Sequence, residues 1–153
     1  MLQLIVNRGL PGSGKSTWAE AWLEEDRAHR VRANRDNLRF ELFGRYAGLS
    51  FEQEERITRL QRSLVTAALR AGHDVVVDDT HLRALYVRQW EHLARREGAE
   101  LVVLDFPIDV ATAIERDAAR NRTVGADAIR YLAEQFTDNG ELRPFARDML
   151  VTQ

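Results

Sequence analysis

One stretch of the chain constrains the fold more than any other. Residues 9–17 read GLPGSGKST, which places Gly9, Gly14, Lys15 and Ser16 at the spacing of a P-loop. The run LQLIVN immediately before this stretch is short and apolar, as a buried strand is. A P-loop requires a strand, a glycine-rich turn and a helix N-terminus in this order, because backbone N–H groups must converge on phosphate oxygens. The stretch therefore predicts a nucleoside triphosphate site within an α/β fold.

The remaining chain alternates between strand-like and helix-like segments. Apolar runs predict a first strand at residues 2–7 and further strands at residues 29–34, 73–80 and 101–106. Capping residues and apolar stripes of helical period predict helices at residues 15–25, from about 35, 50–71, 83–97, from 110 into an arginine-rich turn, and 126–137, with a turn at 138–144. Strands separated by helices form βαβ units with parallel pairing. We therefore expect a single P-loop kinase domain over residues 1–153, built as a parallel sheet flanked by helices.

The composition indicates where in the cell the protein is expected and which partners it could bind. The 153 residues include no cysteine, which excludes disulfides and thiolate metal sites, and no apolar run approaches the ~20 residues that cross a bilayer. The N-terminus lacks the basic and apolar pattern of a signal peptide, so we expect a cytoplasmic protein with no membrane partner. The formal net charge of −2 argues against a protein that coats long duplexes, although it permits binding of one nucleic-acid end.

Lysine usage singles out one position in the P-loop. Among the 22 Lys and Arg residues, Lys15 is the only lysine, so no arginine is significant by its type alone. A compact ammonium suits the space between β- and γ-phosphates better than a planar guanidinium does. The Ser16 hydroxyl is expected to bind Mg²⁺, and Thr17 either assists it or caps the helix. The expected nucleotide site comprises Gly12, Ser13, Gly14, Lys15, Ser16 and Thr17.

The segment NRDNLR supplies a carboxylate and a cation at the same rim. Asp36 and Arg39 lie three residues apart and therefore on one helix face, directly after a predicted strand. Taken alone, the pair is most simply a helix N-terminal acid with a surface ion pair. Ligands of parallel sheets bind beyond the carboxyl ends of the strands, however. At that position Asp36 could accept the proton of an acceptor hydroxyl, and Arg39 could bind the acceptor's phosphate.

The segment VVVDDTHL ends the third predicted strand in acidic residues, as a Walker B strand does. Because side chains alternate along a strand, we expect Asp79 to face the site and Asp78 to face elsewhere. His81 has two interpretations, as a substrate contact or as an exposed loop histidine. The second is the more ordinary one.

The segment IERDAARNRTVG contains arginines that follow the last large strand. Arg116 and Arg120 lie four residues apart on one helix face, and Arg122 follows. A solvated arginine face is one interpretation. The location favours another, a lid over residues 116–125 whose guanidinium groups stabilise charge on the transferred phosphoryl group.

These segments in this order resemble the kinase domain of the phage T4-type polynucleotide 5′-hydroxyl kinases. The resemblance covers nearly the whole chain through GLPGSGKSTWA, NRDNLR, DDTHL and ERDAARNRT. Asp78 and His81 depart from it, since the family has a small polar residue and an asparagine there. The chain has no Asp-x-Asp-Gly-Thr phosphatase signature. The resemblance assigns Asp36 as general base, Arg39 and Asp79 to the acceptor, Lys15 and Ser16 to the donor and Mg²⁺, Arg120 as the main lid arginine, and Arg116 to the nucleotide.

The expected reaction is in-line transfer of the γ-phosphoryl group of ATP or another NTP to the 5′-OH of an RNA or DNA end, as in nucleic-acid end repair. A small-molecule P-loop kinase would share the donor half. A non-catalytic NTP-dependent RNA-binding module would need no base, and the missing Asn-Lys-x-Asp motif disfavours a GTPase switch. The sequence leaves open the preference for RNA or DNA, the donor, the strandedness of the end, the oligomeric state, and any separate phosphatase or ligase partner.

Overall fold

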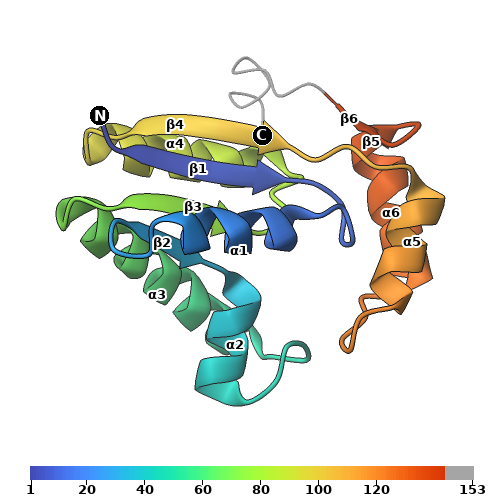
Figure 1. The fold of residues 1–153 in the computed structure, drawn as a ribbon. Coiled ribbons are helices and arrows are strands. Elements are labelled where there is room, and N and C mark those ends of the chain that lie inside the picture. Colours follow the sequence, from blue (N-terminus) through green and yellow to red (C-terminus); the bar gives the residue numbers. More distant parts are fainter. Residues whose placement is uncertain (144–153) are drawn as a thin grey trace.

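A computed structural model describes residues 1–143 of the chain (Figure 1). Its centre is a four-stranded sheet in the order β2-β3-β1-β4, in which every neighbouring pair is parallel. The predicted parallel sheet is confirmed, with slightly shifted strand ends. Its strands are β1 (Gln3–Arg8), β2 (Arg30–Ala33), β3 (Asp74–Asp78) and β4 (Glu100–Asp105).

Helices cover both faces of this sheet (Figure 1). Leu4, Val6 and the matching valines of β3 face α3 (Phe51–Arg70) and α4 (Ala84–Arg96), where they form the largest apolar cluster. Ile5 and Val76 face the opposite way, toward α1 (Lys15–Glu25). The division follows from the alternation of side chains along a strand. Both faces of the sheet are therefore buried, as in other parallel sheets.

Side-chain capping contacts confirm three of the six predicted helix starts. In α2 (Arg35–Phe43) the side chain of Asn34 accepts a hydrogen bond from the backbone N–H of Asn37 at 2.9 Å. Ser50 and Gln53 form both halves of a capping box at the start of α3. Asp109 caps α5 (Val110–Ala118) through the backbone N–H of Thr112. Such caps satisfy N–H groups that lack a partner within the helix.

The last described elements lie apart from the sheet, beyond the carboxyl ends of its strands (Figure 1). Helix α5 packs with α6 (Ala126–Phe136), which ends one residue before the prediction. The predicted turn at 138–144 is the tip of a small antiparallel hairpin of β5 (Thr137–Asp138) and β6 (Glu141–Leu142), and its last residue lies outside the described range. Within residues 1–143, no helix is both long and apolar enough to cross a membrane.

Candidate active site

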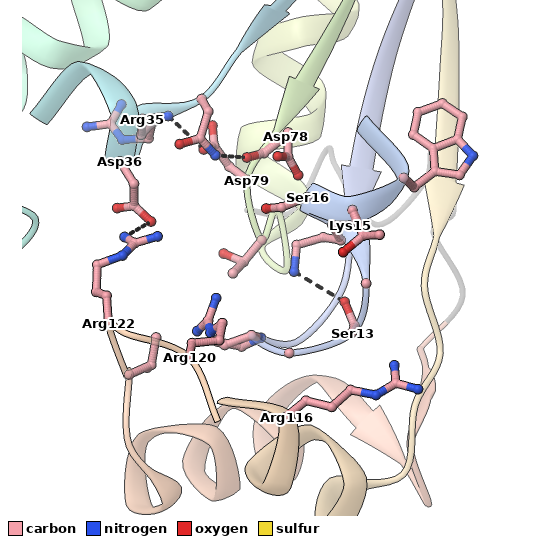
Figure 2. A pocket seen from close by; sticks show the side chains of 18 of the residues that line it. Ser13, Lys15, Ser16, Arg35, Asp36, Asp78, Asp79, Arg116, Arg120 and Arg122 are labelled. Carbon is pink, nitrogen blue, oxygen red and sulfur yellow. Dashed lines mark hydrogen bonds and ion pairs between the residues drawn. The ribbon is translucent and has the colours of Figure 1, made fainter. Parts of the chain in front are cut away.

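A pocket of about 790 Å³ lies between the carboxyl edge of the sheet and the α5–α6 segment (Figure 2). The P-loop, the end of β3, the start of α2 and the loop after α5 each contribute to its wall. Every predicted site residue except His81 lines this pocket. These residues are Gly12, Ser13, Gly14, Lys15, Ser16, Thr17, Asp36, Arg39, Asp79, Arg116 and Arg120.

The P-loop has the backbone geometry that its glycines permit. Gly12 and Gly14 have φ angles of 82° and 98°, in the left-handed region that side chains with a Cβ rarely adopt. A Cβ atom on Gly12 would lie 2.5 Å from the carbonyl oxygen of Ala113 in α5. Gly12 therefore allows the P-loop to pack directly against the helix that leads into the predicted lid.

Lys15 is buried inside the loop, with 7% of its surface exposed. Its Nζ donates hydrogen bonds to the carbonyl oxygen of Leu10 at 2.8 Å and to Ser13 Oγ at 3.2 Å. Burial lowers the pKa of Lys15 to about 8, and the nearby carboxylates of Asp78 and Asp79 offset part of that effect. The single lysine of the chain is thus held at the base of the pocket by oxygen acceptors (Figure 2).

The two acids at the end of β3 both line the pocket, so the predicted division between them is wrong. Asp78 Oδ2 accepts hydrogen bonds from Arg32, while its buried Oδ1 has no hydrogen-bond partner among the described residues. Asp79 accepts from the backbone N–H of Arg35 at 3.0 Å and from Gln61 Nε2 at 2.8 Å. Asp79 lies beyond the last residue of β3, so strand alternation does not govern its direction. Asp79 therefore links α2 to α3 by hydrogen bonds, whereas Asp78 has one buried oxygen without a described partner.

The start of α2 is fastened to β3 by a residue that the sequence analysis did not assign to the site. Asn34 Nδ2 donates to the backbone oxygen of Asp78 at 2.5 Å, while Asn34 Oδ1 caps the helix. Together with the bond between Asp79 and the backbone of Arg35, this contact fixes the first turn of α2. Asp36 stands on that turn. Its position beside the P-loop is therefore set by hydrogen bonds between strand ends.

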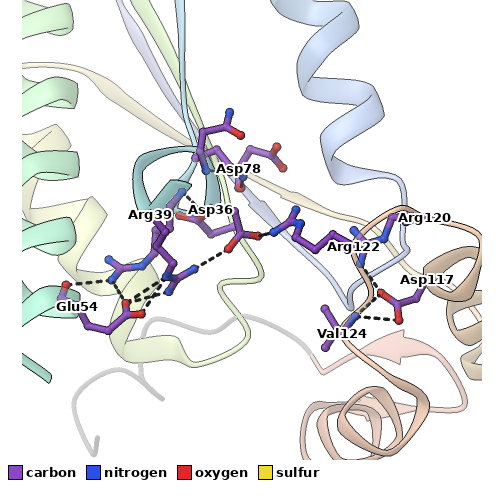
Figure 3. A network of polar contacts seen from close by, with 12 residues as sticks. Asp36, Arg39, Glu54, Asp78, Asp117, Arg120, Arg122 and Val124 are labelled. Carbon is purple, nitrogen blue, oxygen red and sulfur yellow. Dashed lines mark hydrogen bonds and ion pairs between the residues drawn. The ribbon is translucent and has the colours of Figure 1, made fainter. Parts of the chain in front are cut away.

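Asp36 is the centre of a network that runs from α3 to the α5–α6 loop (Figure 3). Arg39 Nη1 donates to Asp36 Oδ1 at 2.7 Å, and Arg122 Nη1 lies 2.6 Å from Asp36 Oδ2. Arg39 also pairs with Glu54, at 2.9 Å from Nε to Oε1. Hydrogen bonds from Arg39 and from Arg35 hold the pKa of Glu54 below its usual value. The predicted ion pair between Asp36 and Arg39 exists, but it is one part of a larger network.

The loop after α5 is shaped by Asp117, which the sequence analysis also missed. This carboxylate is buried, pairs with Arg120, and accepts hydrogen bonds from the backbone N–H groups of Val124 at 3.0 Å and Gly125 at 2.9 Å (Figure 3). Burial alone would raise the pKa of Asp117, but these donors outweigh it and lower the pKa. The charge of Arg120 contributes to the lowered pKa of Lys15, which places the guanidinium near the P-loop. The three-residue spacing between Asp117 and Arg120 was the one feature of the sequence that could have predicted their ion pair.

His81 is buried, so its interpretation as an exposed loop histidine is wrong. It does not line the P-loop pocket, but it lines a neighbouring pocket together with Arg39 and Asp79, and its contact with a substrate stays a prediction. It is 4% exposed, its Nδ1 donates to the backbone oxygen of Asn7 at 2.7 Å, and its Nε2 accepts from Trp90 Nε1 at 3.1 Å. Burial lowers its pKa, which favours the neutral imidazole that this pattern requires. Both ring nitrogens are therefore used within the protein, and His81 fastens the β3–α4 loop to β1.

The parallel sheet, the P-loop at its carboxyl edge and the arginine-bearing segment opposite define the class of the fold as that of the P-loop kinases. The chain belongs to the AAA domain family, whose sequence model matches residues 4–139.

Individual relatives agree with this assignment. The chain is 30% identical over 131 residues to a putative bifunctional polynucleotide kinase/RNA ligase of Autographa californica nuclear polyhedrosis virus, covering 78% of this chain and 18% of that protein. A chain in a structure of a Pnkp1/Rnl/Hen1 complex is 30% identical, with a TM-score of 0.68, and the match covers 75% of this chain and 38% of that one.

Two further solved structures share the fold. A chain of the Pnkp1/Rnl/Hen1 RNA repair complex is 25% identical, with a TM-score of 0.75, and the match covers 95% of this chain and 50% of that one. APS kinase CysC of Mycobacterium tuberculosis, solved with AMPPNP and APS, is 22% identical, with a TM-score of 0.65, and 96% and 86% of the two chains are covered. The chain thus spans half or less of the polynucleotide kinase and Pnkp1/Rnl/Hen1 chains that it matches.

Proposed function

We propose that this chain is a polynucleotide 5′-hydroxyl kinase, which transfers the γ-phosphoryl group of ATP or another NTP to the 5′-OH of an RNA or DNA end. The observation that carries the proposal is the position of Asp36, which shares one pocket with Lys15 and has Arg39 beside it. A carboxylate and a phosphate-binding cation on the acceptor side suit a hydroxyl that is followed by a phosphate. The relative named as a polynucleotide kinase, at 30% identity, supports the same reading.

On the donor side, the P-loop N–H groups and Lys15 would bind the β- and γ-phosphates. Arg120, held by Asp117, faces the same pocket and would stabilise charge on the transferred group. The segment 116–125 would act as the lid, with Arg116 on its pocket side. Donor binding alone does not distinguish this function from that of a small-molecule kinase. The two functions differ in the acceptor that the pocket binds.

Magnesium fits the oxygen atoms that the pocket offers. Residues 1–143 contain no group of three or more His, Asp or Glu side chains that could hold a metal ion. Mg²⁺ in phosphoryl-transfer sites takes one or two protein oxygens together with phosphates and water. Ser16 and the unpaired Oδ1 of Asp78 would hold the ion, and when bound it would neutralise charge on the donor phosphates.

On the acceptor side, Asp36 would accept the proton of the 5′-OH as its oxygen attacks the γ-phosphorus. The new bond joins the 5′-oxygen to phosphorus, the bond from phosphorus to the β-γ bridging oxygen breaks, and the NDP leaves. Arg39 would bind the phosphate on the 3′ side of the acceptor nucleotide and so place the hydroxyl near Asp36. Catalysis of this kind depends mainly on positioning and charge stabilisation.

Arg39→Ala should raise the KM for a nucleoside 3′-monophosphate by about 10- to 100-fold, the range that loss of one charged hydrogen bond produces. The KM for the NTP should stay near that of the wild type, because Lys15 and the P-loop are intact. Steady-state kinetics with each substrate varied in turn measure both values. Arg130→Ala is the control, since Arg130 is an exposed arginine of α6 paired only with Asp127 in the described contacts. An equal rise in both KM values would contradict this role.

A further inference from the structure

Three planar side chains, those of Phe40, Tyr46 and Arg122, lie together beside Asp36, and Arg122 also lines the pocket. The Tyr46 ring, in the loop between α2 and α3, lies against the Phe40 ring with centroids 4.9 Å apart and planes 14° apart. The Arg122 guanidinium also lies over the Tyr46 ring, with its Cζ 4.1 Å from the ring centroid. Phe40 and Tyr46 are 51% and 37% exposed. Neither ring belongs to the apolar clusters formed by the described core residues.

Arg122 also contacts Asp36, which is the proposed general base. Arg122 Nη1 lies 2.6 Å from Asp36 Oδ2, so one flat group contacts both the face of Tyr46 and the carboxylate. A guanidinium is planar and delocalised and stacks on aromatic rings much as a nucleobase does. The face of Tyr46 and the carboxylate of Asp36 are separated by the span of one such group. A nucleoside is longer than this group, but its path from base to sugar is bent, so its 5′-OH can lie near Asp36 while its base lies on the Tyr46 ring.

We propose that the face of the Tyr46 ring over which Arg122 lies is a stacking subsite for the terminal nucleobase of the acceptor, and that Arg122 occupies this subsite until the acceptor binds. The proposal rests on the proposed function, because it names where the base lies when the 5′-OH meets Asp36. Stacking accepts every base, since each has a π-face, and it contributes affinity without reading sequence. Displacement of Arg122 would also release the 116–125 segment from α2.

The subsite can be tested by comparing an acceptor that has a nucleobase with one that lacks it. Steady-state kinetics should compare wild type, Tyr46→Ala and Tyr46→Phe on a purine nucleoside 3′-monophosphate and on the matching abasic sugar 3′-phosphate. Tyr46→Ala should raise the KM for the nucleotide acceptor about tenfold or more, the size of one base stacked on an aromatic ring, with little change in the KM for the NTP. Tyr46→Phe should restore the wild-type KM. The abasic acceptor should have a high KM that is the same in all three proteins.

Tyr131→Ala is the matched control, because Tyr131 is a tyrosine of α6 that is 56% exposed. This variant should have the wild-type KM for both acceptors. An unchanged nucleotide KM in Tyr46→Ala would overturn the subsite. An equal change for both acceptors would also overturn it, because Tyr46 would then act only by holding the lid arginine. If the wild type phosphorylates neither acceptor, the proposed function is wrong, and the subsite with it. The other two outcomes would overturn only the subsite, so the two kinds of failure can be distinguished.

Discussion

Asp36→Asn should bind an NTP with Mg²⁺ as the wild type does and yet lose phosphorylation of 5′-OH oligonucleotides by about 10²- to 10⁴-fold, the contribution of a positioned general base. The amide has nearly the size and shape of the carboxylate, but it cannot accept the proton of the acceptor hydroxyl. Single-turnover transfer measures the chemical step, and calorimetric titration measures donor binding. Chemistry and donor affinity should therefore separate in this variant.

The carboxylate of Asp36 also pairs with Arg39 and Arg122, so the variant needs a control for lost ion pairs. Asp127→Asn removes an exposed carboxylate of α6 that pairs with Arg130, and its transfer rate should equal that of the wild type. Arg122→Ala removes one pair of Asp36 while keeping the carboxylate. If Asp36→Asn retained wild-type transfer, Asp36 would be a structural acid of the α2 terminus and the assignment of the base would be wrong.

Nucleotide affinity should weaken as the pH rises through the pKa of Lys15, which burial lowers to about 8. Below that pH the ammonium is charged and can neutralise the β- and γ-phosphates. Above it, the free protein must take up a proton to bind, so the Kd for an NTP with Mg²⁺ should rise roughly tenfold for each pH unit. Titration calorimetry between pH 7 and pH 9.5 measures this slope. A Kd that does not change over this range would contradict the role given to Lys15.

Two substitutions distinguish the effect of the Lys15 charge on transfer from the effect of its deprotonation on affinity. Lys15→Ala should fold and lose transfer by about 10²- to 10³-fold or more, as expected when a preorganised cation is removed. Lys15→Arg should transfer little better, because a planar guanidinium does not match a site built for a point charge. Its affinity should also show no slope near pH 8, since the guanidinium stays charged. Near-normal turnover of Lys15→Ala would rule out the P-loop mechanism.

Folding does not explain that pH dependence. The pKa of Lys15 is lowered to about 8 in the folded protein, so the unfolded chain holds the additional proton between about pH 8 and pH 10.4. Stability rises with pH wherever the unfolded state binds more protons. The cost to folding stability of burying the charged Lys15 side chain therefore declines across the same pH window in which nucleotide affinity declines. Thermal melts without nucleotide, compared between wild type and Lys15→Ala, measure this contribution.

Local patterns in the sequence were sufficient for the sheet, the helix starts and the nucleotide end of the pocket. The P-loop and the capping box of Ser50 and Gln53 involve residues close in sequence, so their geometry follows from spacing. The division of roles between Asp78 and Asp79 could not be read in this way. It depends on Arg32 and Gln61, which approach from other elements.

Long-range contacts explain the remaining differences. His81 resembles a loop residue in sequence, and only the positions of Asn7 and Trp90 show that it is buried and paired. The contact of Arg122 with Asp36 and Tyr46 joins segments that no local pattern relates. Asp117 is different, because its spacing to Arg120 was visible. Its role becomes evident only where the backbone N–H groups of Val124 and Gly125 converge on its carboxylate.

The proposed function is tested most directly by phosphoryl transfer from an NTP that is labelled on its γ-phosphate, with the wild-type protein as the enzyme. The acceptors should be 5′-OH RNA and DNA oligonucleotides, a nucleoside 3′-monophosphate, the unphosphorylated nucleoside, and a panel of small-molecule kinase substrates, with Mg²⁺ present. A polynucleotide 5′-hydroxyl kinase should transfer label to the 5′ ends of the oligonucleotides and to the 3′-phosphorylated nucleoside, and the plain nucleoside should be a poor acceptor. If a plain nucleoside or a small metabolite were phosphorylated as efficiently as the oligonucleotides, the polynucleotide assignment would be wrong and the protein would be a small-molecule kinase.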